Sequence, residues 1–168
     1  MEIFCRDTKL NISKAYLKPG FAYGGSCLPK DLRALRTIAH DHYLSSPVLE
    51  SIEKSNEHQK DLVCREIQRL GQQNVGFLGL SFKAGTDDLR ESPIVDVIER
   101  LLGKGFNVRI YDRNVHVARL TGANKEYILQ KIPFIGRFIT DDLAEVLNNS
   151  ELIVVVNNEP GLKEALQR

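Results

Sequence analysis

The chain has 168 residues, of which 42% are apolar and 27% are charged, values ordinary for a globular protein that is large enough to bury a core. Its formal net charge of +1 gives no sign of a nucleic-acid partner or of an acidic membrane surface. No apolar run reaches the ~20 residues of a membrane span, and three cysteines at irregular spacing indicate neither a disulfide framework nor a metal site, so we expect a cytoplasmic protein without metal.

The first predicted helix begins at Pro29 and runs to about His42, because proline favours the first helical turn and apolar residues then recur at helical spacing. Cys27 therefore lies at or just before the helix N-terminus, where free N–H groups and the helix dipole stabilise a thiolate, the nucleophilic form of cysteine. Lys30 adds a nearby cation, and Asp31 supplies a carboxylate that could orient a water or relay a proton. The pattern favours a nucleophile over the alternative, a half-buried structural cysteine in a turn.

A second, longer helix is predicted from Pro47 to Leu70, capped by Gly71. Its middle, Lys54 to Asp61, is strongly polar, so we expect that part to be exposed or to meet a polar partner. Apolar residues elsewhere along the helix have little to cover them in a chain of this size. Large exposed apolar surfaces mark interfaces, so we expect a homodimer.

Beyond residue 72 the pattern changes to an alternation of strands and helices. Short apolar runs predict buried parallel strands, and helices are predicted between and after them. This order predicts a doubly wound α/β domain over residues 72–168, after the end of a helical domain over residues 1–71. The expected strands are 75–80, 108–111 and 152–156, the expected helices are 92–103, 143–147 and 162–166, and residues 123–140 have no clear pattern.

Two long motifs carry a family resemblance. The run from Lys18 to Asp31, with Gly24-Gly25-Ser26 before the cysteine, resembles the catalytic-cysteine loop of the UDP-glucose/GDP-mannose dehydrogenase family. The run from Gly79 to Pro93 resembles the signature of that family's C-terminal nucleotide-sugar domain. The stretch from Asp112 to Ile128 looks most like the GDP-mannose branch, which makes GDP-mannuronate for alginate-type polymers.

The resemblance implies a Rossmann-like fold and an NAD-dependent oxidation of a sugar alcohol to an acid, in two steps. A cysteine would take part in the second step through a thiohemiacetal and a thioester. Family members are dimers. The resemblance assigns catalysis to Cys27 and Asp31, NAD contacts to Lys30 and Arg90, and nucleotide-sugar contacts to Tyr16, Lys18, Phe21, Gly24, Phe82 and Lys83.

Several alternatives stay open at this point. Arg90 could instead belong to a turn network held by Asp87 or Asp88, and Tyr16 and Phe21 could simply cover a core edge. The substrate could be a UDP-sugar such as UDP-glucose. The chain could also be a non-catalytic nucleotide-sugar-binding or assembly module.

The family's enzymes begin with a dinucleotide-binding domain that carries a Gly-x-Gly-x-x-Gly turn, and the sequence contains no such turn. We therefore expect a fragment of a longer enzyme. Hydride transfer needs a preorganised cofactor site, so we expect no turnover from this chain alone.

Overall fold

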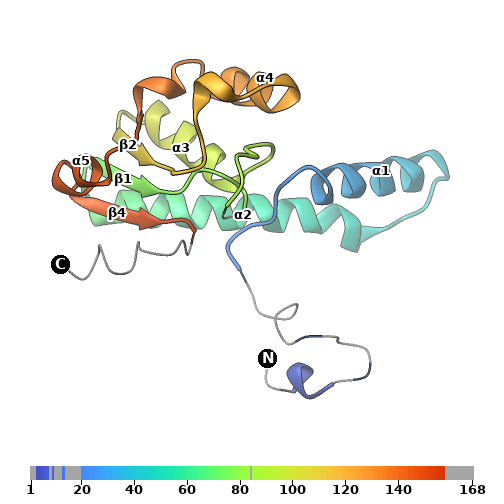
Figure 1. Ribbon diagram of the computed structural model, residues 1–168. Helices are drawn as coiled ribbons and strands as arrows, with labels where there is room; N and C mark the ends of the chain where they lie inside the picture. Colours follow the sequence, from blue (N-terminus) through green and yellow to red (C-terminus); the bar gives the residue numbers. More distant parts are fainter. Residues whose placement is uncertain (1–2, 8, 10–12, 14–19, 84, 158–168) are drawn as a thin grey trace.

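A computed structural model describes residues 3–7, 9, 13, 20–83 and 85–157 of the chain (Figure 1). Two helices come first, and an alternation of strands and helices follows. In chain order the elements are η1 (Phe4–Arg6), α1 (Leu28–Asp41), α2 (Pro47–Leu70), β1 (Asn74–Leu78), α3 (Pro93–Gly103), β2 (Asn107–Tyr111), η3 (Val117–Arg119), α4 (Gly122–Lys131), η4 (Ile135–Arg137), β3 (Ile139–Thr140), α5 (Leu143–Asn148) and β4 (Leu152–Val155).

The strands form one parallel sheet in the order β3-β2-β1-β4. β1 is central, and its Phe77 is level with Ile110 of β2 and Val154 of β4. Parallel neighbours need crossover connections, which the helices supply. The predicted α/β architecture is confirmed. Because β2 and β4 lie on opposite sides of β1, the strand order reverses there, and ligands of such sheets bind beside the carboxyl ends of the strands at that point.

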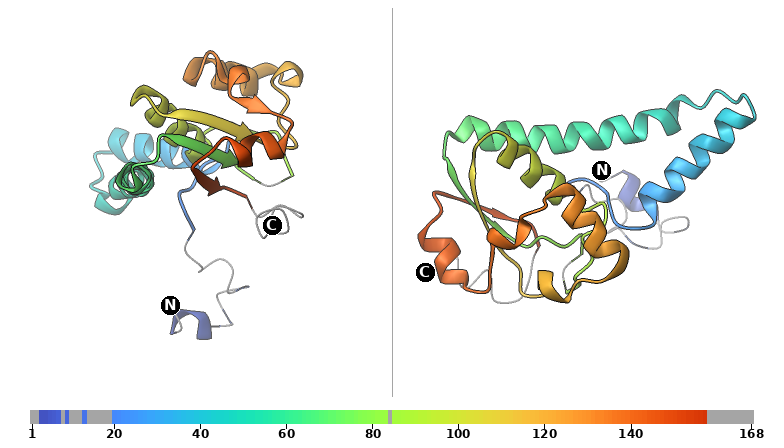
Figure 2. Two further views of the ribbon diagram at one scale, coloured as in Figure 1. Left: turned by 90° about the vertical axis from the view of Figure 1, so that its left-hand side faces the viewer. Right: turned by 90° about the horizontal axis from the view of Figure 1, so that it is seen from above.

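The main core lies between the sheet and α3, while α5 covers the opposite face. Phe77 and Ile110 of the sheet and Val97 of α3 have no exposed surface. The C-terminal half of α2 joins this core through Cys64 and Ile67. α4 packs beside α3, and the left view of Figure 2 shows α2 nearly end-on, on the α3 side of the sheet.

α2 runs from Pro47 to Leu70 and is capped by Gly71, as predicted, and the φ of Gly71 is 72°, in the left-handed region. Its first half projects away from the sheet together with α1, and the two form a hairpin (Figures 1 and 2). The polar middle of α2 meets a polar partner, as expected, because the ammonium of Lys60 is buried against Asp96 of α3. The division at residues 71 and 72 stays a prediction.

The segment without a clear pattern contains α4, η4 and the two-residue strand β3. In α4, Ile128 is the one residue in the buried class, and β3 is too short to show an alternation of apolar and polar residues. Both elements are therefore specified by their packing against α3 and β2, and the sequence carries little local signal for them. The helix expected at 162–166 lies outside the described residues.

Candidate functional site

Cys27 is the residue that precedes α1, as the proline pattern predicts. Its φ and ψ are −95° and −63°, and Pro29 stands in the first turn. The Asp31 amide donates to the Cys27 carbonyl oxygen over 2.9 Å. The cysteine is exposed, and its sulfur lies 3.8 Å from the Ser26 hydroxyl. The thiol is thus accessible and lies at a helix N-terminus.

Lys30 and Asp31 flank the cysteine on the solvent side. Their side chains pair over 3.5 Å and are 69% and 63% exposed. Residues four apart on a helix lie on one face, so Asp31 is on the face of α1 that continues from Cys27. An exposed pair of this kind contributes little to stability, and both side chains are free to reorient toward a ligand.

The loop before α1, residues 20–27, carries Cys27 and is called the cysteine loop. It packs tightly against the loop that follows β1. A Cβ built on Gly24 would lie 2.0 Å from the Glu91 carbonyl oxygen, and one on Gly25 would lie 2.7 Å from the Phe82 ring. Gly25 also has a φ of 81°, which L side chains rarely adopt. The close approach at these two glycines is made by the loop after β1, and Gly24 is buried against it.

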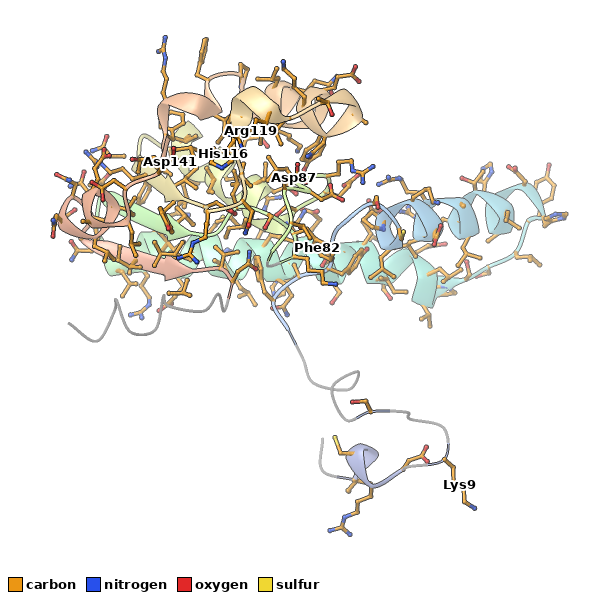
Figure 3. All side chains as sticks on the ribbon, viewed as in Figure 1. Lys9, Phe82, Asp87, His116, Arg119 and Asp141 are labelled. Atoms are coloured by element: carbon orange, nitrogen blue, oxygen red, sulfur yellow. The ribbon has the colours of Figure 1, made fainter. Side chains whose placement is uncertain are left out.

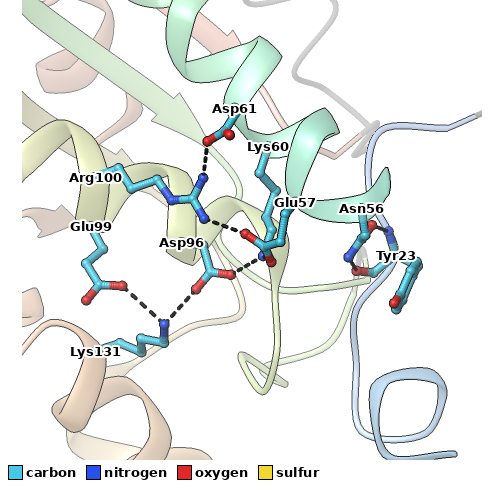
Figure 4. Close-up of polar contacts among 9 residues, drawn as sticks. All are labelled: Tyr23, Asn56, Glu57, Lys60, Asp61, Asp96, Glu99, Arg100 and Lys131. Atoms are coloured by element: carbon cyan, nitrogen blue, oxygen red, sulfur yellow. Dashed lines mark hydrogen bonds and ion pairs between the residues drawn. The ribbon is translucent and has the colours of Figure 1, made fainter. Parts of the chain in front are cut away.

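An asparagine of α2 holds the other side of the cysteine loop. The Tyr23 amide donates to Oδ1 of Asn56 over 2.8 Å, and Nδ2 of Asn56 donates to the Tyr23 carbonyl oxygen over 3.0 Å (Figure 4). The side-chain amide thereby satisfies both backbone groups of Tyr23. The loop is fixed between α2 and the residues after β1.

The loop from Leu80 to Ser92 is anchored at its start by Asp112, which directly follows β2. One carboxylate oxygen of Asp112 accepts from the amides of Leu80 and Ser81 over 2.7 and 3.1 Å. The other accepts from the Asn114 amide over 2.9 Å. An acid at this place in a dinucleotide-binding fold commonly binds a ribose. Here it is 1% exposed and engaged with the backbone on both oxygens, so its role is to hold the loop.

Arg90 lies in the same loop and forms a forked pair with Asp88. Nε and one terminal nitrogen of Arg90 donate to the two carboxylate oxygens, each over 2.9 Å. Hydrogen bonds from Arg90 hold the pKa of Asp88 below its ordinary value. Asp88 in turn raises the pKa of Arg90, and the negative charge of a Cys27 thiolate adds to this effect. The turn network considered for Arg90 is therefore present, with Asp88 as its acid, and Arg90 lies within electrostatic reach of the cysteine.

A network of charged side chains lies between α2, α3 and α4 (Figure 4). Lys60 of α2 is ion-paired with Glu57 and, over 2.6 Å, with Asp96 of α3. Lys131 of α4 lies 3.0 Å from the other oxygen of Asp96. Burial acts to raise the pKa of Asp96, but hydrogen bonds from the two lysines outweigh it and hold the pKa below its ordinary value. Arg100 adds a second bridge to α2 over 2.6 Å to Glu57.

A cavity of about 50 Å³ is lined by Lys60 and Asp96 of this network and by Tyr23, Pro29 and Glu91. The space accommodates water and no larger ligand. The charged network and the loop that carries Cys27 therefore border the same small cavity.

Further polar side chains gather at the carboxyl edge of the sheet. Nδ1 of His116, after β2, lies 3.7 Å from a carboxylate oxygen of Asp141, after β3, and Figure 3 shows them with Arg119 and Asp87. Among the described residues, no group of three or more His, Cys, Asp or Glu side chains could hold a metal ion. Within the same part of the chain, no helix combines the length and apolar character needed to cross a membrane.

The structure brings together several residues that the sequence had singled out. Gly24 and Phe82 belong to the contact between the loops, and Arg90 lies in the same loop as Phe82, next to Glu91. Lys83 is exposed in the loop after β1. Phe21 instead lines a groove with Ile52 and other residues of α2. Tyr16 and Lys18 lie outside the described residues.

Two residues that sequence reasoning missed support this arrangement. Asn56 holds Tyr23, and its signal was the polar middle of α2, which indicated a polar partner without naming one. Glu91 presses its carbonyl oxygen against Gly24 at a φ of 52°, and its carboxylate binds Arg33 of α1 over 3.1 Å. No local pattern marks a glutamate in a left-handed conformation.

Two sequence profiles of one family match the chain. The profile described as UDP-glucose/GDP-mannose dehydrogenase family, UDP binding domain, matches residues 76–168, and the profile of the central domain matches residues 1–58. GDP-mannose 6-dehydrogenase of Pseudomonas aeruginosa is 50% identical over 95% of the chain. UDP-glucose 6-dehydrogenase of Rickettsia bellii is 41% identical over 60% of the chain.

A crystal structure of a ternary complex of GDP-mannose dehydrogenase from Pseudomonas aeruginosa is similar over the whole chain, with a TM-score of 0.84 and 48% identity. The chain covers 38% of that protein. It likewise spans 36% of the length of the GDP-mannose 6-dehydrogenase and 24% of the UDP-glucose 6-dehydrogenase.

Proposed function

Because the chain belongs to the UDP-glucose/GDP-mannose dehydrogenase family, we propose that it supplies the nucleophilic cysteine and part of the nucleotide-sugar site of an enzyme that oxidises GDP-mannose to GDP-mannuronate. The observation that carries this proposal is the contact between the two motif loops. Gly24 and Gly25 seat the Cys27 loop directly on Glu91 and Phe82. A sugar held by the loop after β1 would therefore lie beside the thiol.

Cys27 is the proposed nucleophile for the second oxidation. Its thiolate attacks the aldehyde carbon of the half-oxidised sugar, and the oxygen takes a proton to give a thiohemiacetal. Loss of two electrons and two protons from that adduct, one proton from the carbon and one from the hydroxyl group, gives a thioester. Water then adds to the thioester carbon, and the carbon–sulfur bond breaks to release the acid and the free thiol. Asp31, on the same helix face, is proposed to position that water.

NAD, when bound, would accept the electrons that the sugar carbon loses. The described residues fit contacts to its phosphates, because Lys30 is exposed and the side chain of Arg90 is 41% exposed beside Asp88. They do not fit a full dinucleotide site, since Asp112 is committed to backbone amides. We propose that Lys30 and Arg90 face the cofactor from the substrate side.

The nucleotide sugar is proposed to lie along the loop after β1, in contact with Phe82 and Lys83. Both side chains are exposed at the carboxyl edge of the sheet, where α/β proteins bind ligands. Lys83 suits a phosphate oxygen as a compact point charge. Tyr16, Lys18, Phe21 and Gly24 complete the proposed contacts.

The preference for GDP-mannose over a UDP-sugar is supported by higher identity over more of the chain. We propose a cytoplasmic location and a homodimer as well. If the chain binds UDP-glucose better than GDP-mannose, the proposed substrate changes to a UDP-sugar and the family assignment is kept. Binding without any protection of the cysteine would favour a non-catalytic module.

The test is protection of Cys27 from alkylation. Iodoacetamide is added to the chain in short pulses, with and without GDP-mannose or UDP-glucose, and each cysteine is followed by peptide mass spectrometry. Cys27 should be labelled faster than Cys64, because burial raises the pKa of the Cys64 thiol and hides it from the reagent. GDP-mannose should slow the labelling of Cys27 and leave that of Cys64 unchanged.

Lys83→Ala should abolish the protection, whereas Lys104→Ala should retain it. Lys104 is also an exposed lysine, but it follows α3 at the far end of the sheet. The proposed site would be overturned by a Cys27 thiol that labels no faster than Cys64, by protection that survives Lys83→Ala, or by protection that is lost in Lys104→Ala.

A further inference from the structure

We propose that Asn124 of α4 is a positioning residue for the site around Cys27, because its side-chain amide holds the middle of the loop that carries Arg90. The inference rests on the proposed function of Cys27 and Arg90. It gives a role to α4, whose sequence showed no clear secondary-structure pattern.

Asn124 contacts the backbone on both sides of Asp88. Its Oδ1 accepts from the Leu89 amide over 2.9 Å, and its Nδ2 donates to the Asp87 carbonyl oxygen over 2.8 Å. Two bonds in opposite senses fix both the distance and the orientation of this short stretch. The half-buried amide therefore works on this loop as Asn56 works on Tyr23.

The three residues 87–89, which Asn124 binds at both ends, determine where Arg90 points. Asp88 lies between the two clamped residues and holds the guanidinium through both carboxylate oxygens. Leu89 is fully buried in the core, so the stretch cannot rotate freely about its own axis. A shift at Asp87 or Leu89 would be passed through Asp88 to the guanidinium of Arg90, whose neighbour Glu91 contacts Gly24 in the loop that carries Cys27.

Other anchors hold the ends of this loop, and within it the Phe82 amide donates to the Asp88 carbonyl oxygen over 3.0 Å. Asp112 binds the amides of Leu80 and Ser81, and the Ser92 hydroxyl donates to the Leu80 carbonyl oxygen over 3.1 Å. These contacts are part of the structural core of the domain. Asn124 is the described side chain from another element that reaches the loop beside Arg90 through hydrogen bonds to its backbone.

The chemistry of the site fits an asparagine in particular. An amide offers an acceptor and donors together, whereas an ionised aspartate offers acceptors alone. Asn124→Asp would keep a partner for the Leu89 amide but would face the Asp87 carbonyl oxygen with a negative charge. Asn124→Ala would lose both bonds.

The experiment follows the Arg90 Nε–H signal and the Leu89 amide by NMR in the full chain. In Asn124→Ala, exchange of the Leu89 amide should be faster by about fivefold, the effect of one lost hydrogen bond, and the Arg90 Nε–H signal should shift or broaden. The Arg69 Nε–H group, held by Glu66 over 2.9 Å on α2, is the internal control and should not change. Asn107→Ala is the matched variant, because Asn107 bonds to a side chain at the opposite end of the sheet.

A double-mutant cycle on the alkylation rate of Cys27 then separates positioning from general stability. Removing Asn124 should slow Cys27 labelling about twofold, the effect of one weakened surface charge, when Arg90 is present. The same substitution should have no further effect in Arg90→Gln. An equal effect in both backgrounds, or an unchanged Arg90 signal in Asn124→Ala, would overturn the proposal.

Asn124→Asp keeps the test decisive should the alanine variant unfold. It should retain the slow exchange of the Leu89 amide and still displace the Arg90 signal, and an undisplaced signal would count against the role. These outcomes do not depend on nucleotide-sugar binding. Failure of GDP-mannose to protect Cys27 would therefore defeat the proposed function while leaving the contact between Asn124 and Arg90 separately measurable.

Discussion

Gly24→Ala is the substitution that most directly tests the contact between the two motif loops. The added Cβ would lie 2.0 Å from the Glu91 carbonyl oxygen and 2.8 Å from Cδ of Pro93. Ordinary contacts between carbon and a carbonyl oxygen are about 3.3–3.6 Å long. Relief of the clash therefore requires one of the two loops to move by more than about 1 Å.

The Glu91 side of the contact cannot yield easily. Glu91 has a left-handed φ of 52°, and Pro93 is fixed in the first turn of α3. The movement should fall on the Cys27 loop, which is held on its other side by Asn56. Overpacking in a closely packed site costs about 1–3 kcal/mol, and we expect Gly24→Ala to lower the free energy of unfolding by that amount.

Urea unfolding measures the change in stability, and the labelling rate of Cys27 reports the displacement of its loop. Gly20→Ala is the matched control, because a Cβ there meets no atom within 4 Å. It should change the free energy of unfolding by less than about 0.5 kcal/mol. If Gly24→Ala and Gly20→Ala behave alike in both assays, the two loops do not pack as described.

Three further predictions concern the charged network and the hairpin. Lys60→Met should lower the free energy of unfolding by about 3 kcal/mol, the lower end of the range for a broken buried pair, because Lys131 still faces Asp96. Lys54→Met, at an exposed position of the same helix, should be near neutral. Equal effects of the two substitutions in urea unfolding would contradict the burial of Lys60. The pKa of Asp96 in the folded protein lies below the ~3.9 of an unfolded chain. The stability that ionised Asp96 contributes is therefore present above pH ~3.9 and is lost as the pH falls through the folded pKa. Acid unfolding, followed by circular dichroism, should be less steep in Asp96→Asn. Ile38 is 54% exposed on α1, so we expect a homodimer that pairs through this helix and that Ile38→Lys weakens. Sedimentation checks this, and a monomer at micromolar concentration would refute the interface.

The sequence predicted those elements whose signals are local. Pro29 and Pro47 each open a helix at the expected place, and Gly71 ends one in the left-handed conformation. The apolar runs gave the parallel strands because a buried strand in such a sheet is apolar on both faces. The position of Cys27 followed from the proline alone.

The contacts that assemble the site could not be predicted in this way, because they join residues far apart in the chain. Gly24 meets Glu91, and Asn56 meets Tyr23, through backbone groups that any residue type would present. Asn124 belongs to a helix with few buried residues, so neither its helical state nor its reach to Leu89 has a periodic signal. Resemblance placed the two motifs in one enzyme family, but the packing between them appears only in three dimensions.

The ion pairs of Lys60 and Arg100 hold the long helix α2 near its middle. The loop that carries Cys27 is bound at Asn56, about 6 Å along the helix axis from Lys60, and the helix begins at Pro47, about 20 Å from Lys60. A tilt of about 5° about Lys60 would move the hairpin end by roughly 1.7 Å and the position of Asn56 by roughly 0.5 Å. Cys27 is therefore held close to the point about which α2 would tilt, where a movement of the hairpin would displace it least.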